Sequence, residues 1–352
     1  MAGIYISYPF CSQKCTYCNF ASGVFSKDLE AQYQQALLQE IRAHAWEWTP
    51  ETVYLGGGTP SLIDPTFLLN ALPGKPWAEA TIEAAPGTLN IETWRDAGLN
   101  RVSLGVQSFV TTELRRTGRR HTAETVERDV AMLRAAGFHN INIDLIAGLP
   151  LQTAASWSQS LDWIERLNPP HVSVYMLEVD EDSTLGAEII LGGKRYSAMD
   201  TPTEDATAEM YETAVERLKA VSIVRYEISN FARPGFESLH NLKYWQLAPY
   251  IGFGADAHSF DGRRRWQNAE SAQAYVNGGA REYSEANADE KFFVGLRLMG
   301  GVRPDPAEWK RYEEPIRRFV DNGLMETDGA LLRLTARGVM VSNDIFQEFL
   351  TA

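Results

Sequence analysis

Short apolar runs alternate with helical periodicities along the first 230 residues of the chain. Most of the runs are dense in Val, Ile, Leu and Tyr instead of alternating strictly with polar residues, which is typical of strands buried on both faces. Between the runs lie helical stretches, such as Leu29 to Ala45, in which apolar residues recur every four positions. The predicted strands are Gly3–Tyr8, Thr52–Leu55, Ala80–Glu83, Arg101–Val106, Ile141–Ala147 and His171–Val179.

Two further helices are predicted over Glu124–Ala136, closed by Gly137 as a C-cap, and over Asp205–Ala220. Six β–α units in series predict parallel strands joined by helical crossovers. The expected fold class is therefore α/β, with a partial (β/α)6 barrel. In such a sheet the chemistry lies at the C-terminal ends of the strands and in the loops that follow them.

The pattern changes after residue 234. Pro234 to Gly254 is rich in aromatic residues and glycine and predicts loops. From about Asp289 a compact, mainly helical region begins, and its end, "LLRLTARGVMVSNDIFQEFL", indicates a short strand or turn followed by a helix. We therefore expect a partial barrel in 1–234, connecting loops in 235–288, and a small C-terminal domain in 289–352.

Composition and charge narrow the class of protein. The chain is 44% hydrophobic and has no low-complexity tract, which is typical of a globular protein. A formal net charge of −13 argues against a general nucleic-acid binder, which would need a basic face. No signal-peptide pattern and no run of roughly 20 uncharged apolar residues is present, so we expect a cytoplasmic protein without a membrane span. These features are also compatible with peripheral binding to a membrane surface.

Every cysteine of the chain lies in one short stretch, as Cys11, Cys15 and Cys18 with the spacing C-x3-C-x2-C. An odd number of cysteines in a long chain does not fit a disulfide framework. A structural zinc site needs four protein ligands, so it would require a distant histidine or carboxylate. Three thiolates suit a 4Fe–4S cluster with one iron left open for a small chelating ligand. Zinc and three unrelated buried cysteines remain the alternatives at this point.

Polar and glycine residues stand at the ends of the other predicted strands. "GGGTPS" ends the second strand, and its glycines allow the backbone to approach a ligand closely. Asp144 lies between Ile143 and Leu145, where a carboxylate is costly unless it is bonded or faces the lumen of the barrel. The side chains that together predict one functional rim are Glu83, Gln107, Arg119 and Asp144.

Five segments together carry a resemblance to a known family: "YISYPFCSQKCTYCNF", "GGGTPS", "GVQSF", "GRRHT" and "DLIAGLP". In this order they resemble the coproporphyrinogen III oxidase-like branch of the radical S-adenosylmethionine (SAM) superfamily. The resemblance implies a 4Fe–4S cluster on Cys11, Cys15 and Cys18, with SAM chelating the open iron. Reduction by one electron would then cleave SAM to methionine and a 5′-deoxyadenosyl radical. Tyr17 and Phe20 match the aromatic positions over the cluster.

The resemblance also implies which residues contact SAM. The glycine segment would hold the amino group, Tyr5 and Arg119 would lie on the carboxylate side, and Glu83 would bond the ribose. Gln107 and Asp144 would complete the nucleoside pocket. The full set that it assigns to SAM is Tyr5, Phe20, Gly56, Gly57, Gly58, Thr59, Glu83, Gln107, Arg119 and Asp144.

A second motif, "HNLKYW" at residues 240–245, places His240 beside Tyr244 and Trp245. Histidine is a common axial ligand of haem iron, and aromatic side chains suit the face of a porphyrin. The residues alone favour a histidine that caps or bonds a loop and two aromatics that fill the core. The motif, together with "FFVGLRLMGGV" and "LTARGVMVSN", resembles the haem chaperone family HemW, whose members bind haem and hand it to apoproteins.

The resemblance therefore implies a haem chaperone with three cofactors: a 4Fe–4S cluster, SAM and haem. The implied partners are haem or porphyrin, haem-accepting apoproteins and an electron-donor protein. The alternative is an anaerobic coproporphyrinogen III oxidase, a radical SAM enzyme of porphyrin biosynthesis that performs an oxidative decarboxylation. Those oxidases carry a further cysteine where this chain has Phe20, so a chaperone is favoured, and no catalytic residue is assigned.

Two positions depart from the family pattern. Ser7 stands where the family usually has histidine, and Ala85 stands where asparagine is common. Neither position is a predicted cluster ligand.

Overall fold

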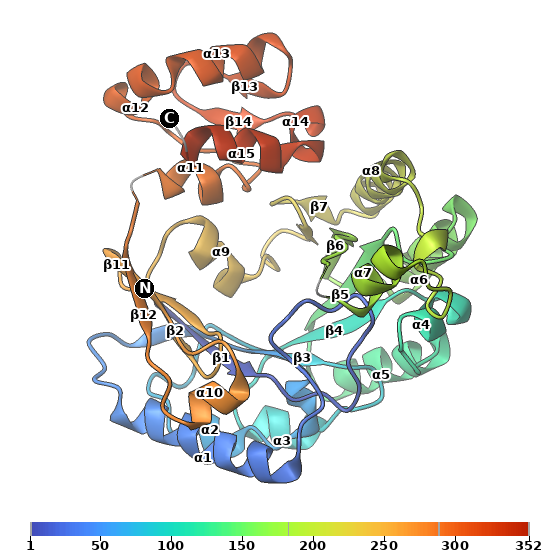
Figure 1. Cartoon of the computed structure of the whole chain (residues 1–352), viewed down its shortest axis with the longest axis vertical. Helices are drawn as coiled ribbons and strands as arrows, with labels where there is room; N and C mark the ends of the chain where they lie inside the picture. Colours follow the sequence, from blue (N-terminus) through green and yellow to red (C-terminus); the bar gives the residue numbers. More distant parts are fainter. Residues whose placement is uncertain (1, 182, 288, 351–352) are drawn as a thin grey trace.

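The computed structural model describes residues 2–181, 183–287 and 289–350, and its centre is a twelve-stranded sheet (Figure 1). Its middle is a run of parallel strands that pair in chain order, each with the next. The predicted α/β class with a partial (β/α)6 barrel is confirmed. The six parallel strands are β1 (Ala2–Tyr8), β2 (Pro50–Gly57), β3 (Glu79–Ala84), β4 (Arg101–Gln107), β5 (Asn140–Ala147) and β6 (His171–Met176).

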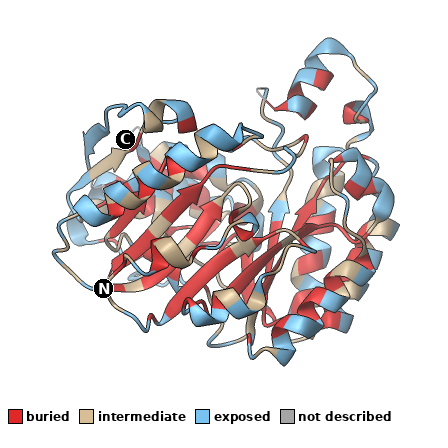
Figure 2. Cartoon of the chain, turned by 90° about the horizontal axis from the view of Figure 1, so that it is seen from below, coloured by how far each residue is buried: buried red, intermediate tan, exposed pale blue. Residues whose placement is uncertain are grey.

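Helices cover the outer face of this sheet, as the crossovers between parallel strands require. Figure 2 shows the strands as a buried layer and the helices with exposed outer faces. Helix α1 buries Tyr33, Leu37 and Ile41, one residue per turn, against the sheet. Gly137, with φ +89°, ends α5 as predicted. The covering helices are α1 (Lys27–Ala43), α2 (Thr66–Leu69), α3 (Ile91–Asp96), α4 (Thr111–Arg116), α5 (Ala123–Ala135), α6 (Ala154–Leu167) and α8 (Glu204–Ala220). Helix α7 (Thr184–Leu191) instead contacts the cysteine loop, where the N–H of Leu185 donates to the carbonyl of Thr16 at 2.8 Å.

Short strands extend the sheet at both edges. At one edge β8 pairs antiparallel with β6 and with β7, and at the other β9 pairs parallel with β1. A meander of β10, β11 and β12 follows β9. These added strands are β7 (Val224–Arg225), β8 (Asn230–Ala232), β9 (Tyr250–Phe253), β10 (His258–Phe260), β11 (Arg264–Gln267) and β12 (Glu282–Glu285).

The prediction of loops from Pro234 to Gly254 is therefore wrong. The structure has helix α9 (Leu239–Trp245) and strand β9 in this stretch, and α10 (Ala272–Val276) further along the connecting segment. Strand β9 has four residues, too few for a periodicity to show, and its pairing with β1 makes it a strand. The division into 1–234, 235–288 and 289–352 stays a prediction.

The C-terminal part is mainly helical, as predicted, and lies beside the open side of the barrel (Figure 1). Its core contains Phe292, Tyr312 and Phe349, with the rings of Phe292 and Phe349 stacked at 4.9 Å. A strand followed by a helix ends the chain, in agreement with the sequence pattern. The elements are α11 (Glu290–Gly295), α12 (Pro306–Arg311), α13 (Glu313–Asp321), β13 (Met325–Thr327), β14 (Leu332–Leu334), α14 (Ala336–Met340) and α15 (Ser342–Leu350).

Helix α9 closes the lumen at the N-terminal ends of the strands. The Glu79 carboxylate, at the start of β3, accepts hydrogen bonds from the backbone N–H groups of Leu239 and His240 at 3.0 and 2.9 Å. Such a carboxylate compensates the positive end of a helix. Arg101, at the start of β4, pairs with Glu79 at 3.8 Å, and both side chains are 2% exposed. A buried ion pair thus fixes α9 inside the barrel.

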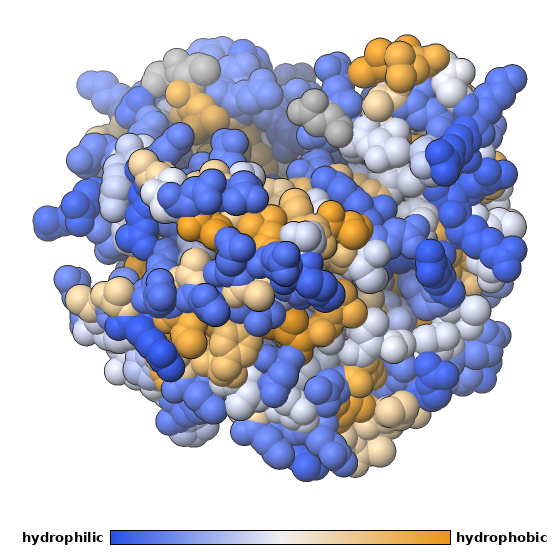
Figure 3. All heavy atoms as spheres, turned by 60° about the horizontal axis from the view of Figure 1, so that its bottom comes forward, coloured by the Kyte–Doolittle hydropathy of each residue, from blue (hydrophilic) through white to orange (hydrophobic). Residues whose placement is uncertain are grey.

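The molecular surface is mostly hydrophilic on the face shown in Figure 3, with hydrophobic side chains gathered in patches. Among the residues that the structure describes, no helix combines the length and the apolar character needed to span a bilayer.

Replacing Glu79 tests the role of the buried ion pair. We expect Glu79→Ala to lower the free energy of unfolding by about 3–5 kcal/mol, because Arg101 would remain as a buried cation without its partner. Urea denaturation measures the loss. Glu51→Ala is the matched control, since this carboxylate pairs with Lys243 but is 28% exposed. Equal losses for the two variants would contradict the assigned role.

Candidate functional site

A cavity of about 1060 Å³ opens at the C-terminal ends of β2 to β6. Its volume lies at the upper end of the range of roughly 300–1,000 Å³ that is usual for small-molecule pockets. Its lining includes the cysteine loop after β1, the strand ends, residues 118–121, and the junction of α14 and α15 at residues 339–344. The position agrees with the rim predicted for a parallel barrel.

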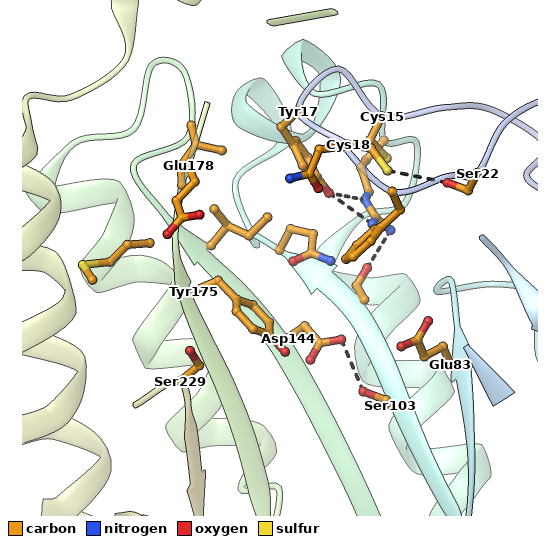
Figure 4. Close-up of a pocket in the computed structure, with 18 of the residues that line it drawn as sticks. Cys15, Tyr17, Cys18, Ser22, Glu83, Ser103, Asp144, Tyr175, Glu178 and Ser229 are labelled. Carbon is orange, nitrogen blue, oxygen red and sulfur yellow. Dashed lines mark hydrogen bonds between the residues drawn. The ribbon is translucent and has the colours of Figure 1, made fainter. Parts of the chain in front are cut away.

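All three cysteines line this cavity, and each thiol is free and half-buried. The loop is held by its backbone, since the N–H of Cys11 donates to the carbonyl of Gly23 at 2.8 Å. The sulfur of Cys18 lies 3.6 Å from the hydroxyl of Ser22 (Figure 4). Burial raises the pKa of the Cys11 thiol.

The thiols do not form a closed metal site in this arrangement. Within the described ranges, no group of three Cys, His, Asp or Glu side chains is assembled closely enough to hold an ion. The donor set nevertheless fits a 4Fe–4S cluster, because three unpaired thiols on one loop face one cavity. The short loop supplies no fourth thiol, which leaves one metal corner for another ligand.

The glycine segment after β2 supports the base of the cysteine loop. The N–H of Gly58 donates to the carbonyl of Tyr8 at 2.8 Å, and the N–H of Thr59 donates to the carbonyl of Phe10 at 2.9 Å. A Cβ on Gly58 would lie 2.7 Å from the carbonyl oxygen of Phe10, closer than real contacts allow. Glycine is therefore required here for the two loops to pack side by side.

Two carboxylates form the floor of the cavity beneath the cysteine loop (Figure 4). Glu83 accepts hydrogen bonds from the hydroxyl of Tyr54 at 2.9 Å and from the N–H of Gly57 at 3.1 Å. Burial, together with the charge of Asp144, raises the pKa of Glu83 to about 7. Asp144 accepts from the amide of Asn142 at 2.7 Å, and burial raises its pKa as well.

Arg119 joins the cysteine loop to the barrel. Its guanidinium donates to the carbonyl of Gly105 on β4 at 2.7 Å and to the hydroxyl of Tyr17 at 3.2 and 3.3 Å. Gln107 lies at an irregularity in β4 and has φ +70°, an unusual conformation for a residue other than glycine. Its buried Oε1 has no hydrogen-bond partner among the described residues, so this atom is available to a ligand donor.

The cavity brings together most of the residues predicted to contact SAM. Tyr5 and Gly56 lie deeper and do not line it; a Cβ on Gly56 would lie 3.1 Å from both Tyr5 and Glu83. Ala85, one of the two departures from the family pattern, is part of the wall. The predicted residues that line the cavity are Cys11, Cys15, Cys18, Phe20, Gly57, Gly58, Thr59, Glu83, Gln107, Arg119 and Asp144.

The residues of the HNLKYW motif do not line the cavity. His240 is buried, with Nδ1 bonded to the hydroxyl of Thr52 at 2.9 Å and Nε2 to the hydroxyl of Tyr244 at 2.8 Å. Burial lowers the pKa of His240 to about 3. Trp245 lies beneath the guanidinium of Arg297. The motif is a helix inside the barrel and not an open loop, and His240 offers no free ring nitrogen in this arrangement.

Several cavity residues escaped the sequence analysis. Tyr175 lies near the end of β6 and Glu178 follows that strand, Ser229 precedes β8, and Arg297 follows α11 (Figure 4 labels the first three). The segment "LTARGVMVSN" resembles the family, but nothing in its pattern indicates that residues 339–344 reach the barrel. His121 also lines the cavity, with Nε2 3.1 Å from the carbonyl oxygen of Val106.

Comparison with known proteins identifies relatives along the whole chain. The model of the radical SAM superfamily matches residues 5–164. The chain is 33% identical to the heme chaperone HemW of Lactococcus lactis, over 98% of this chain and 96% of that protein. It is also 33% identical to the heme chaperone HemW of Bacillus subtilis, over 99% of each.

A solved structure supports the fold. Coproporphyrinogen III oxidase (HemN) from Escherichia coli, a radical SAM enzyme, superposes with a TM-score of 0.84 over 99% of this chain and 90% of that one. Its sequence identity is 24%, so the match is evidence for the fold alone.

Substituting Gly58 tests the packing of the two loops. We expect Gly58→Ala to lower the free energy of unfolding by about 1–3 kcal/mol and to reduce iron and sulfide uptake several-fold, because the new Cβ would displace the cysteine loop. Unfolding curves and metal analysis after anaerobic reconstitution measure both effects. Gly300→Ala is the control, since a Cβ there meets no atom within 4 Å. Normal uptake by Gly58→Ala would argue against the close approach.

The raised pKa of Glu83 predicts a dependence of stability on pH. The folded protein keeps this proton up to about pH 7, whereas the unfolded chain releases it near pH 4.5. The free energy of unfolding should therefore fall by roughly 3 kcal/mol as the pH rises between these values. Glu83→Gln should flatten this part of the profile, measured by urea denaturation. The exposed Glu282→Gln should leave it unchanged, and a Glu83→Gln profile equal to that of the parent would refute the assignment.

Proposed function

Because the chain belongs to the HemW family of the radical SAM superfamily, we propose that it is a haem chaperone, which binds haem and transfers it to apoproteins. One observation carries the proposal. The cavity has three thiols and the predicted SAM residues on one side, and further wall from β6, residues 228–229 and the C-terminal domain on the other. The volume thus accommodates a second ligand beside a cluster and SAM.

The cysteine side of the cavity fits the cofactors that radical SAM proteins bind. Cys11, Cys15 and Cys18 would hold a 4Fe–4S cluster, which when bound supplies one-electron chemistry to SAM. Glu83 and Asp144 offer acceptors for the hydroxyl and amino groups of a nucleoside. The guanidinium of Arg119 lies close to the cysteine loop, through Tyr17, and there favours the carboxylate of SAM.

The opposite side of the cavity suits a flat, largely apolar ligand. Tyr175, Met176, Ile228, Val339 and Met340 contribute to this wall. Aromatic and apolar side chains of this kind pack against the face of a planar ring. Their presence supports haem as the second ligand.

The assignment of His240 as the haem ligand requires a rearrangement. Its two ring nitrogens would have to leave Thr52 and Tyr244 before either could bind iron. In the described conformation the imidazole instead stabilises the packing of α9 in the lumen. Tyr244 and Trp245 could contact haem only after the same rearrangement of the His240 hydrogen bonds.

The proposal includes partners and a compartment. The acceptors are haem-binding apoproteins, and a cluster that changes its redox state needs an electron-donor protein. Reduced, free thiols suit the cytoplasm. The formal net charge of −13 supports a set of partners that does not include nucleic acid.

The alternative is an anaerobic coproporphyrinogen III oxidase, an activity found on the same fold in the Escherichia coli enzyme. Phe20 occupies the position of the additional cysteine of those oxidases. Its side chain is 66% exposed at the cavity, so this chain presents an apolar ring to the ligand where those enzymes have a thiol. The two functions can therefore be told apart by measuring whether the protein converts coproporphyrinogen III.

Anaerobic reconstitution followed by titration with haem, with and without SAM, tests the proposal. We expect iron and sulfide in the parent protein, haem uptake, and transfer of the bound haem to apomyoglobin. Cys15→Ser should lose most of the iron and sulfide, since a cluster ligand is removed. His240→Ala should lose haem affinity if the imidazole becomes an iron ligand. A variant with lower stability and normal haem affinity would show that His240 only stabilises the packing of α9.

Two results would overturn the proposal. One is a reconstituted protein that takes up no haem. The other is conversion of coproporphyrinogen III to protoporphyrinogen IX by the reduced protein with SAM, which would establish the oxidase.

A further inference from the structure

Arg297 is fixed at the cavity by its backbone. The residue follows α11, and its carbonyl accepts a hydrogen bond from the N–H of Ile228 at 3.1 Å. Two residues further, the N–H of Met299 donates to the carbonyl of Tyr226 at 3.0 Å, with a β-bridge between Glu227 and Leu298. The segment after α11 thus pairs with the turn before β8, and this pairing holds Arg297 in the cavity wall.

The guanidinium of Arg297 is positioned by an aromatic ring. It lies 4.5 Å from the centre of the Trp245 ring, an arrangement that orients its plane. Its Nε is buried and has no hydrogen-bond partner. Within residues 2–181, 183–287 and 289–350, the structure gives this side chain no ion pair and no hydrogen bond. A buried guanidinium donor without an acceptor is unfavourable, so the group is ready for an anionic ligand.

No acidic side chain in the described part of the chain forms an ion pair with Arg297. Burial raises the pKa of Glu227 and the nearby charge of Arg297 lowers it. Oε1 of Glu227 accepts hydrogen bonds from Ser229 and Asn230, and its buried Oε2 has no hydrogen-bond partner among the described residues. Glu178 and Asp344 also line the cavity, and neither forms an ion pair with Arg297. The other cations around the cavity, Lys14, Arg119 and Arg120, belong to the cysteine loop or to the residues next to it.

The chemistry of the site points to a carboxylate on a flat apolar ligand. A guanidinium matches a carboxylate with two parallel hydrogen bonds. Tyr175, Met176, Ile228 and Met340, which share this cavity, suit a planar ring. We infer that Arg297 binds a propionate carboxylate of haem, an inference that rests on the proposed haem-chaperone function. Trp245 acts as a positioning residue, because it reaches the ligand only through Arg297.

The test compares haem with haem dimethyl ester, in which both propionates are uncharged. Both probes are titrated against the reconstituted full-length chain and followed by visible absorbance. We expect the parent protein to bind haem more tightly than the ester. Arg297→Gln should weaken haem binding about tenfold or more and leave binding of the ester unchanged. Arg297→Lys should fall between them, since it keeps the charge and loses the planar fork.

Arg263→Gln is the matched control, because this arginine is exposed in the turn between β10 and β11 and does not line the cavity. It should bind both probes as the parent does. Equal haem affinity of Arg297→Gln and the parent would overturn the inference, and so would an equal loss for haem and its ester, which would indicate packing on Trp245.

The design also separates this inference from the proposed function. A parent protein that binds neither probe contradicts the haem chaperone itself. A parent that binds haem and ester equally contradicts only the carboxylate site, and this comparison needs no variant, so it decides the matter even if Arg297→Gln does not fold. Thermal unfolding of each variant reports whether it is folded.

Discussion

Buried polar groups in the lumen of an incomplete parallel barrel must find partners, and the rest of the structure depends on this requirement. A closed barrel fills its interior with side chains from its own strands, whereas this one stays open on one side. At the N-terminal ends of the strands, the Glu79 carboxylate forms an ion pair with Arg101 and accepts hydrogen bonds from the first turn of α9. At the C-terminal ends, Glu83, Gln107 and Asp144 line a cavity instead. The same requirement therefore explains both the closed end and the binding end.

The cysteine loop depends on backbone contacts more than on its own sequence. It has no regular secondary structure, and the glycine segment after β2 packs against its base because Gly58 has no side chain. On its other side Tyr17 and Arg119 connect the loop to β4. These contacts place three thiols above two carboxylates whose pKa values are raised by burial. The arrangement puts three thiols and two carboxylates in one cavity, which agrees with the cluster and SAM that the family membership implies.

The C-terminal part of the chain adds to the wall of the cavity. Residues 339–344 and Arg297 come from this part of the chain, yet they face the strand ends. Trp245 of the HNLKYW motif contacts Arg297, so the motif influences the cavity through a neighbour. The motif thus has a structural role inside the barrel and a second one at the cavity wall, without His240 reaching the cavity itself.

The sequence by itself determined the parallel barrel, and it placed the cysteine loop and most of the predicted SAM residues on one rim, where the structure has a cavity. Apolar periodicity identifies long buried elements such as β1 and α1, and polar residues at the ends of parallel strands must share one rim. The spacing of Cys11, Cys15 and Cys18 is local information of the same kind. Only the tertiary structure decided the four-residue strand β9, the place of His240 inside the lumen and the approach of Arg297 to the cavity. Short segments have little intrinsic preference for one conformation, and contacts between residues far apart in the sequence leave no periodicity along the chain.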